Sequence, residues 1–148
     1  MNRRSARWAV MLVGAMLVGC QTIQQPVEPE ALLQSVTLSD EMDVGPAGGT
    51  LSCGPYSLVI PPGALSGTVH ISMTQVTPGE WPIDLEPHGT QFNVPVVLSF
   101  DAYSEKDPAS MTVQYLNPQT NSWEDWPTTH AGTTCSAELP HFSRWKLL

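Results

Sequence analysis

Short apolar runs separated by glycine- and proline-containing turns fill the chain from about Val44 onward, and they constrain the fold more than any other feature. The runs include GTLSC, YSLVI, PVVLSF, MTVQYL and GTTCSAEL. Apart from the apolar run at the N-terminus and a short EALLQ segment, no stretch has the 3.6-residue periodicity of a helix. The pattern predicts an all-β domain, and short strands at this spacing are typical of a β-sandwich.

Two of these segments give more detailed expectations. Apolar and polar residues alternate in TVHISMTQV, which predicts a strand with one buried face. That face would carry Val69, Ile71, Met73 and Gln75. In IPPGAL, Pro62 and Gly63 suit the central positions of a type II turn, because proline fixes φ and glycine accepts a positive φ.

The N-terminus carries a separate signal. MNRRSAR contains three arginines, and the apolar run WAVMLVGAMLVG follows and ends at Cys20. A basic start, a short apolar run and small residues are typical of a secretory signal, and the run is shorter than the roughly 20 residues of a membrane-spanning helix. The tetrapeptide at 17–20, LVGC, resembles the lipobox of bacterial lipoproteins. This resemblance implies that residues 1–19 are removed and that the Cys20 thiol is acylated; the alternative is a plain secretory signal with an incidental cysteine.

Lipidation sets the expected organisation of the chain. Acylated Cys20 would hold the protein to a lipid bilayer, and Gln21 at the next position implies sorting to the outer membrane, facing the periplasm or the cell surface. Residues 20–43 are polar and contain prolines, so we expect a flexible tether there. Residues 44–148 would form the folded domain.

The charge of the mature chain excludes one class of partner. Removal of residues 1–19 takes away three of the six Lys and Arg residues and none of the 14 acidic residues, which leaves a formal net charge of −11. Nucleic-acid phosphates are bound through clusters of Lys and Arg. We therefore expect no nucleic-acid partner.

Two cysteines remain besides Cys20. In an oxidising compartment Cys53 and Cys135 can form a disulfide, and such a bond would close a long loop and stabilise the domain by about 4–5 kcal/mol. We expect this disulfide; the alternative is two buried thiols that do not meet.

The order of motifs along the chain resembles that of ZU5 domains, a β-sandwich module of ankyrins and netrin receptors. The first block is GGTLSCGPYSLVIPPGALSGTVHISMTQV, the second is LEPHGTQFNVPVVLSFDAY, and the third is a tryptophan-bearing hairpin, YLNPQTNSWEDWP, followed by LPHFSRW. Together they span about residues 44–148. The resemblance implies a ZU5-like sandwich that mediates protein contacts or is structural, without catalysis on other molecules and without a cofactor.

The tripeptide His141-Phe142-Ser143 has two interpretations. In some ZU5-containing proteins a Phe–Ser bond cleaves itself, and this resemblance implies attack by Ser143 Oγ on the Phe142 carbonyl, with His141 assisting proton transfer. The simpler interpretation is an ordinary closing strand, in which His141, Ser143 and Trp145 alternate with Phe142 and Arg144. We expect the strand and keep self-processing as an alternative.

Other candidate sites rest on single residue types. Exposed tryptophans bind sugars in some proteins, and Trp81 or Trp126 could serve a carbohydrate-binding module, whereas Trp123 is expected in the core. The acidic residues Asp101, Glu105 and Asp107 could meet a calcium ion, although a solvated loop is the simpler interpretation. The four histidines have no metal-ligand spacing, so no metal site is expected from His70, His88, His130 and His141.

Overall fold

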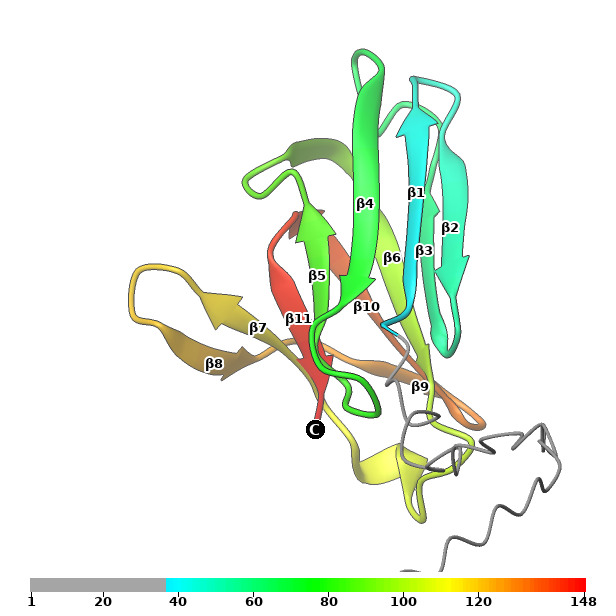
Figure 1. Ribbon diagram of the computed structural model, residues 1–148, viewed down its shortest axis with the longest axis vertical. Helices are drawn as coiled ribbons and strands as arrows, with labels where there is room; N and C mark the ends of the chain where they lie inside the picture. The colour runs from blue at the N-terminus through cyan, green and yellow to red at the C-terminus, as the bar shows by residue number, and fades with distance from the viewer. Residues whose placement is uncertain (1–36) are drawn as a thin grey trace, which may run out of the picture. The chain divides into compact units, whose positions relative to one another are not determined.

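The computed structural model describes residues 37–148, which form two antiparallel β-sheets packed face to face (Figure 1). The predicted all-β sandwich is therefore confirmed. Sheet A has the strand order β1 (Ser39–Val44), β4 (Val69–Gln75), β5 (Ile83–Glu86), β11 (Arg144–Leu147), β7 (Val113–Asn117) and β8 (Ser122–Asp125). Sheet B has the order β2 (Gly49–Cys53), β3 (Tyr56–Ile60), β6 (Gln91–Asp101), β10 (Thr134–His141) and β9 (Thr129–Ala131). A 3₁₀ turn, η2 (Pro108–Ser110), lies between β6 and β7.

The core between the sheets follows the expected alternation. In β4, Ile71, Met73 and Gln75 are buried, and the residues between them are partly exposed. The predicted turn after β3 is also present, because Gly63 has φ of 82° and the Ala64 N–H donates to the Pro61 carbonyl oxygen at 3.2 Å. Both sheets thus bury one face in a common core. The loops at the ends of the sandwich lie on the surface, where binding residues are often found.

The folded part begins before the expected boundary at Val44. Residues 39–43 of strand β1 lie within the segment expected as tether, and the strand pairs with β4 along its whole length. Its sequence, SDEMDV, is mostly polar, and Val44 is its one buried residue. Because β1 is an edge strand with one pairing partner, polar residues are tolerated there, and the apolar pattern that predicts a strand is missing.

The end of the chain crosses from one sheet to the other. Strand β10 belongs to sheet B, whereas β11 is inserted between β5 and β7 of sheet A. Phe142 and Ser143 form the corner between these strands, and both are buried. The expectation of one continuous strand with His141 and Ser143 on the face opposite Phe142 is therefore wrong, because a corner between two packed sheets directs consecutive side chains into the interior.

The predicted disulfide between Cys53 and Cys135 is also wrong, and both thiols are free and buried. The strand register places Tyr56 of β3 and Phe100 of β6 between the two cysteines, in one row across sheet B. Neighbouring strands are about 4.8 Å apart, so the two Cα atoms are roughly 14 Å apart, and a disulfide requires less than about 7 Å. The Cys135 Sγ–H instead donates to the Pro108 carbonyl oxygen at 3.3 Å.

The signal segment and the predicted acylation site at Cys20 lie outside the described residues. Within residues 37–148, no helix is long and apolar enough to cross a membrane.

Candidate functional site

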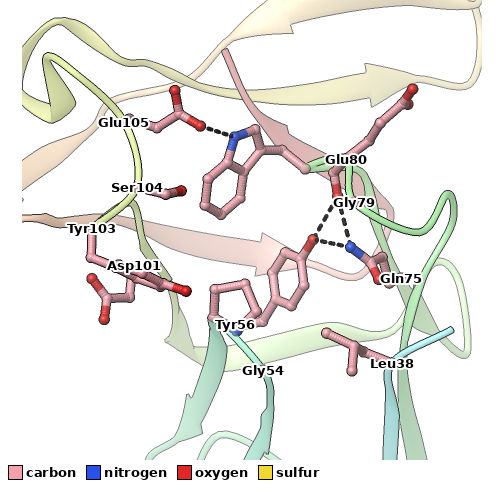
Figure 2. A pocket seen from close by; sticks show the side chains of 12 residues that line it. Leu38, Gly54, Tyr56, Gln75, Gly79, Glu80, Asp101, Tyr103, Ser104 and Glu105 are labelled. Carbon is pink, nitrogen blue, oxygen red and sulfur yellow. Dashed lines mark hydrogen bonds between the residues drawn. The ribbon is translucent and has the colours of Figure 1, made fainter. Parts of the chain in front are cut away.

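A cleft of about 560 Å³ opens at the end of the sandwich where β1 begins (Figure 2). Three loops and the start of β1 contribute to it: the β2–β3 turn, the β4–β5 loop and the β6–β7 loop. The lining residues are Leu38, Gly54, Pro55, Tyr56, Gln75, Gly79, Glu80, Trp81, Asp101, Tyr103, Ser104 and Glu105. Segments that are far apart in the sequence thus form one surface, which we call the aromatic cleft.

A hydrogen-bond network fixes the floor of the aromatic cleft. Gln75 is buried although it is polar, and its Nε2 donates to the Tyr56 hydroxyl at 3.1 Å and to the Glu80 carbonyl oxygen at 2.9 Å. The Tyr56 hydroxyl donates to the same carbonyl oxygen at 2.8 Å. Because buried polar groups are costly when unpaired, this closed network holds the β4–β5 loop against β3.

Trp81 stands in that loop and is held from two sides. Its indole Nε1–H donates to Glu105 Oε1 at 3.2 Å, and its ring packs edge-to-face against Tyr56 and Phe100, with centroids 6.2 Å apart in each case. Tyr103, on the facing loop, is 74 % exposed. The aromatic cleft therefore presents a positioned indole and a freely accessible phenol to solvent.

The aromatic cleft is acidic. Glu80, Asp101 and Glu105 carry carboxylates on its exposed lining, and none of the described lining residues is Lys, Arg or His. The ion pairs among residues 37–148 involve other acids, namely Glu41, Asp43 and Asp84. The three cleft carboxylates are thus without a cationic partner within the described part of the chain.

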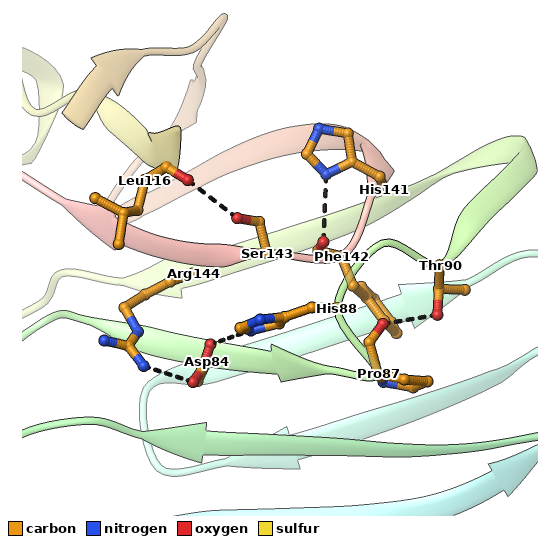
Figure 3. A network of polar contacts seen from close by, with 9 residues as sticks. All are labelled: Asp84, Pro87, His88, Thr90, Leu116, His141, Phe142, Ser143 and Arg144. Atoms are coloured by element: carbon orange, nitrogen blue, oxygen red, sulfur yellow. Dashed lines mark hydrogen bonds and ion pairs between the residues drawn. The ribbon is translucent and has the colours of Figure 1, made fainter. Parts of the chain in front are cut away.

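The corner at Phe142 and Ser143 has a different geometry, shown in Figure 3. The carbonyl oxygen of Phe142 accepts two hydrogen bonds, one from the Gly89 N–H at 3.1 Å and one from His141 Nδ1 at 3.3 Å. Because a carbonyl oxygen can only accept, His141 must carry its proton on Nδ1 in this arrangement. The imidazole therefore supports the carbonyl and is not placed as a base for Ser143.

The hydroxyl of Ser143 points elsewhere. Its Oγ donates to the Leu116 carbonyl oxygen of β7 at 3.2 Å, on the side away from His141 (Figure 3). An open pocket of about 420 Å³ lies beside the corner and is lined by His88, Gln91, Asn117, His141 and other residues. The structure brings the three residues of the motif together at a pocket, with Ser143 and His141 directed at different partners.

The tryptophans singled out in the sequence lie in three different environments. Trp126 packs edge-to-face against Tyr115 and Trp145 and donates to the Glu138 carbonyl oxygen at 2.8 Å, so it is tied to the sandwich. Trp123, expected in the core, is partly exposed, and the Lys146 ammonium lies 4.5 Å from its ring centroid. Trp81 is the one of the two sugar-binding candidates that lines the aromatic cleft.

One cluster was missed in the sequence. Asp84, Glu86 and His88 place their ligand atoms within 4.8 Å of one another. Asp84 and Glu86 lie on one face of β5, because residues i and i+2 of a strand share a face, and His88 stands in the turn that follows the strand. Asp84 is already paired there: it accepts from Arg144 Nη2 at 2.8 Å and contacts His88 Nε2 at 2.7 Å. Burial raises the pKa of Asp84, but hydrogen bonds from Arg144 and His88 outweigh this and lower it below its usual value.

The candidate calcium ligands do not form a comparable group. Asp101 accepts from Thr133 Oγ1 at 2.8 Å, and Glu105 accepts from Trp81. Among residues 37–148, the cluster at Asp84 is the one set of three ligand side chains close enough to share an ion.

Comparison of the chain with protein-family models finds no match, and comparison with curated protein sequences finds none either.

Proposed function

We propose that this protein is a lipid-anchored lipoprotein of the bacterial cell envelope whose ZU5-like β-sandwich binds a partner protein. The observation that carries this proposal is the aromatic cleft, with its positioned Trp81 and exposed Tyr103. Tryptophan and tyrosine are enriched where proteins bind one another, because each has a large rigid surface with a polar tip. The lipobox-like sequence ending at Cys20 supports the anchor, and the order of motifs supports the ZU5-like assignment.

The cleft has the character of a binding surface. Ser104 is the one Ser, Thr or Cys among the described lining residues, and no His lines the cleft beside it. Activation of a serine hydroxyl requires an adjacent base, which is most often a histidine. The geometry thus supports binding, and the protein is proposed to catalyse no reaction on another molecule.

Site-specific photo-crosslinking in the cell envelope tests the proposal. A benzoylphenylalanine residue at the position of Tyr103 should yield one defined protein adduct, and Trp81→Ala should abolish it. The same residue at the position of Val94, which is exposed at the other end of β6, is the control and should yield none. Identical adducts from both positions, or an adduct that survives Trp81→Ala, would contradict the proposal.

The anchor has its own test. Growth with an alkyne-bearing fatty acid should label the protein, and Cys20→Ser should remove the label, because that thiol is the proposed acceptor. Label of equal intensity in the variant would refute acylation at Cys20.

Self-processing at the Phe142–Ser143 bond is the second candidate. The observation in its favour is the pair of donors on the Phe142 carbonyl oxygen, from Gly89 and His141, because two such donors stabilise the negative charge that develops when a carbonyl is attacked. Ser143 Oγ would attack this carbon, the C–N bond would break as the nitrogen takes a proton, and water would hydrolyse the resulting ester. The hydroxyl must first leave Leu116.

Intact mass of the denatured protein decides this second candidate. Cleavage predicts loss of residues 143–148 from the wild type and a complete chain for Ser143→Ala. In the native state the fragment would stay in place, because β11 is paired on both sides, with β5 and with β7. A complete wild-type chain after denaturation would exclude cleavage.

A further inference from the structure

We infer that the aromatic cleft takes a cationic ligand, an arginine-bearing segment of a partner protein, and that neutral glycans are not its ligand class. This inference rests on the proposed binding function and specifies the chemistry of its partner. Three features of the described cleft carry it: an indole at its centre, carboxylates on its lining, and the lack of any cation among its described lining residues.

The acidic charge of the aromatic cleft is uncompensated. Glu80, Asp101 and Glu105 have no ion-pair partner among residues 37–148, so the cleft carries a surplus of negative charge. This surplus attracts a cation that enters the cleft, whereas a neutral sugar leaves it uncompensated. Charge complementarity of this kind selects partners and increases their rate of association.

The indole of Trp81 provides an aromatic surface that suits an arginine side chain. The face of an indole attracts cations electrostatically, and the planar guanidinium group of arginine stacks on it while its N–H groups reach neighbouring carboxylates. Glu105 stands at the indole nitrogen of Trp81, so one arginine side chain can contact the ring and a carboxylate together. Lysine offers a point charge without this planar match.

The cationic ligand comes from outside this chain. The tether of this chain cannot supply it, because residues 20–36 contain no Lys or Arg and include Glu28 and Glu30. A second copy is disfavoured by the same surplus of negative charge. The occupant is therefore a basic segment of a different protein.

Calorimetric titration of the full chain, purified in a nonionic detergent, tests the inference with defined probes. Acetyl-Arg-Arg-amide should bind saturably at low salt and more weakly at high salt, and the matched acetyl-citrulline-citrulline-amide, which has nearly the same shape without the charge, should not bind. Glu105→Gln keeps an acceptor for Trp81 and removes one charge; it should weaken binding about threefold. Trp81→Ala should weaken it further.

Glu138→Gln is the matched control, because Glu138 is exposed on β10 and does not line the cleft. It should leave binding unchanged. Equal binding of the citrulline probe, or equal weakening by Glu138→Gln and Glu105→Gln, would overturn the inference. Binding of tetra-N-acetylchitotetraose in place of the arginine probe would assign the cleft to glycans.

The protein partner and the cationic ligand can be refuted separately. If the arginine probe binds but no specific crosslink forms at Tyr103, the proposal of a protein partner is refuted and the cationic ligand class stands. A specific crosslink together with binding of the citrulline probe would leave the protein partner and refute the cationic ligand.

Discussion

Replacement of Tyr56 by Phe tests the network that holds the floor of the aromatic cleft. The change removes one hydroxyl from a ring that is almost fully buried. This hydroxyl donates to the Glu80 carbonyl oxygen and accepts from Gln75 Nε2. Each such bond contributes about 0.5–1.5 kcal/mol net. Gln75 keeps its direct bond to the same carbonyl oxygen, so no partner is left wholly unpaired, and we expect a loss of about 1–2 kcal/mol.

Urea unfolding followed by circular dichroism measures this loss. With a denaturant dependence of about 1.5–2 kcal/mol per M, the midpoint should fall by roughly 0.5–1.3 M. Tyr103→Phe is the control, because this side chain is 74 % exposed; its effect should stay within about 0.5 kcal/mol. Equal midpoints for the two variants would refute the network argument.

The same substitution has a functional consequence. Because the Tyr56 hydroxyl ties down the carbonyl of Glu80, the residue next to Trp81, its loss should allow the indole to move. Binding to the aromatic cleft should weaken in Tyr56→Phe and stay unchanged in Glu138→Gln, because Glu138 does not line the cleft. A loss of binding without any loss of stability would show that the hydroxyl acts on the ligand directly.

Three further predictions follow from the described contacts. First, Cys53 and Cys135 are free and buried, and burial, followed by the charge of Asp40, raises the pKa of Cys53 to about 11. Both thiols should therefore resist alkylation at pH 8 in the folded protein and react in urea without a reductant. If alkylation in urea requires a reductant, the two cysteines form a disulfide after all. Second, Asp84 has a lowered pKa in the folded protein. Its stabilising effect is therefore present above its unfolded pKa of about 3.9 and is lost as pH falls through the folded value. The difference in unfolding free energy between the wild type and Asp84→Asn should have its full value at pH 6 and be smaller at pH 3. Third, Gly48→Ala should destabilise more than Gly63→Ala: both have φ near 80°, but a Cβ at Gly48 meets backbone atoms 2.8 and 2.9 Å away, and one at Gly63 meets nothing within 4 Å. Equal midpoints in urea for the two glycine variants would contradict the steric account.

The sequence predicts the strands whose residues pack in the core. The alternation of Ile71 and Met73 with polar neighbours is visible because it reflects burial of one face. Strand β1 leaves no such trace, because an edge strand is held by backbone hydrogen bonds to one neighbour and its side chains stay in solvent. Burial can thus be inferred from residue type, whereas backbone pairing at an edge cannot.

The aromatic cleft could be predicted in part. Trp81 stands out as a candidate for surface contact, but Tyr56, Gln75 and Glu105 lie on other strands and loops, and their meeting depends on how those segments pair. The disulfide prediction failed for the same reason. A bond between Cys53 and Cys135 would be chemically feasible in an oxidising compartment, and only the strand register shows that two other strands separate them.

The position of β11 bears on how the protein folds. Its neighbours in sheet A are β5 and β7, and the hydrogen bond between Arg144 and Asp84 joins residues 60 positions apart in the chain. Without β11, the pairings of sheet A join β1, β4 and β5 in one group and β7 and β8 in another, and β5 and β7 each lack a neighbour on one side. Pairing over such distances is slow, and exposed edges associate with other chains. Because β11 is the last strand of the described residues, sheet A cannot close during synthesis until Leu147 has left the ribosome, and a chaperone that covers the edge of β5 during this interval would protect the protein from aggregation.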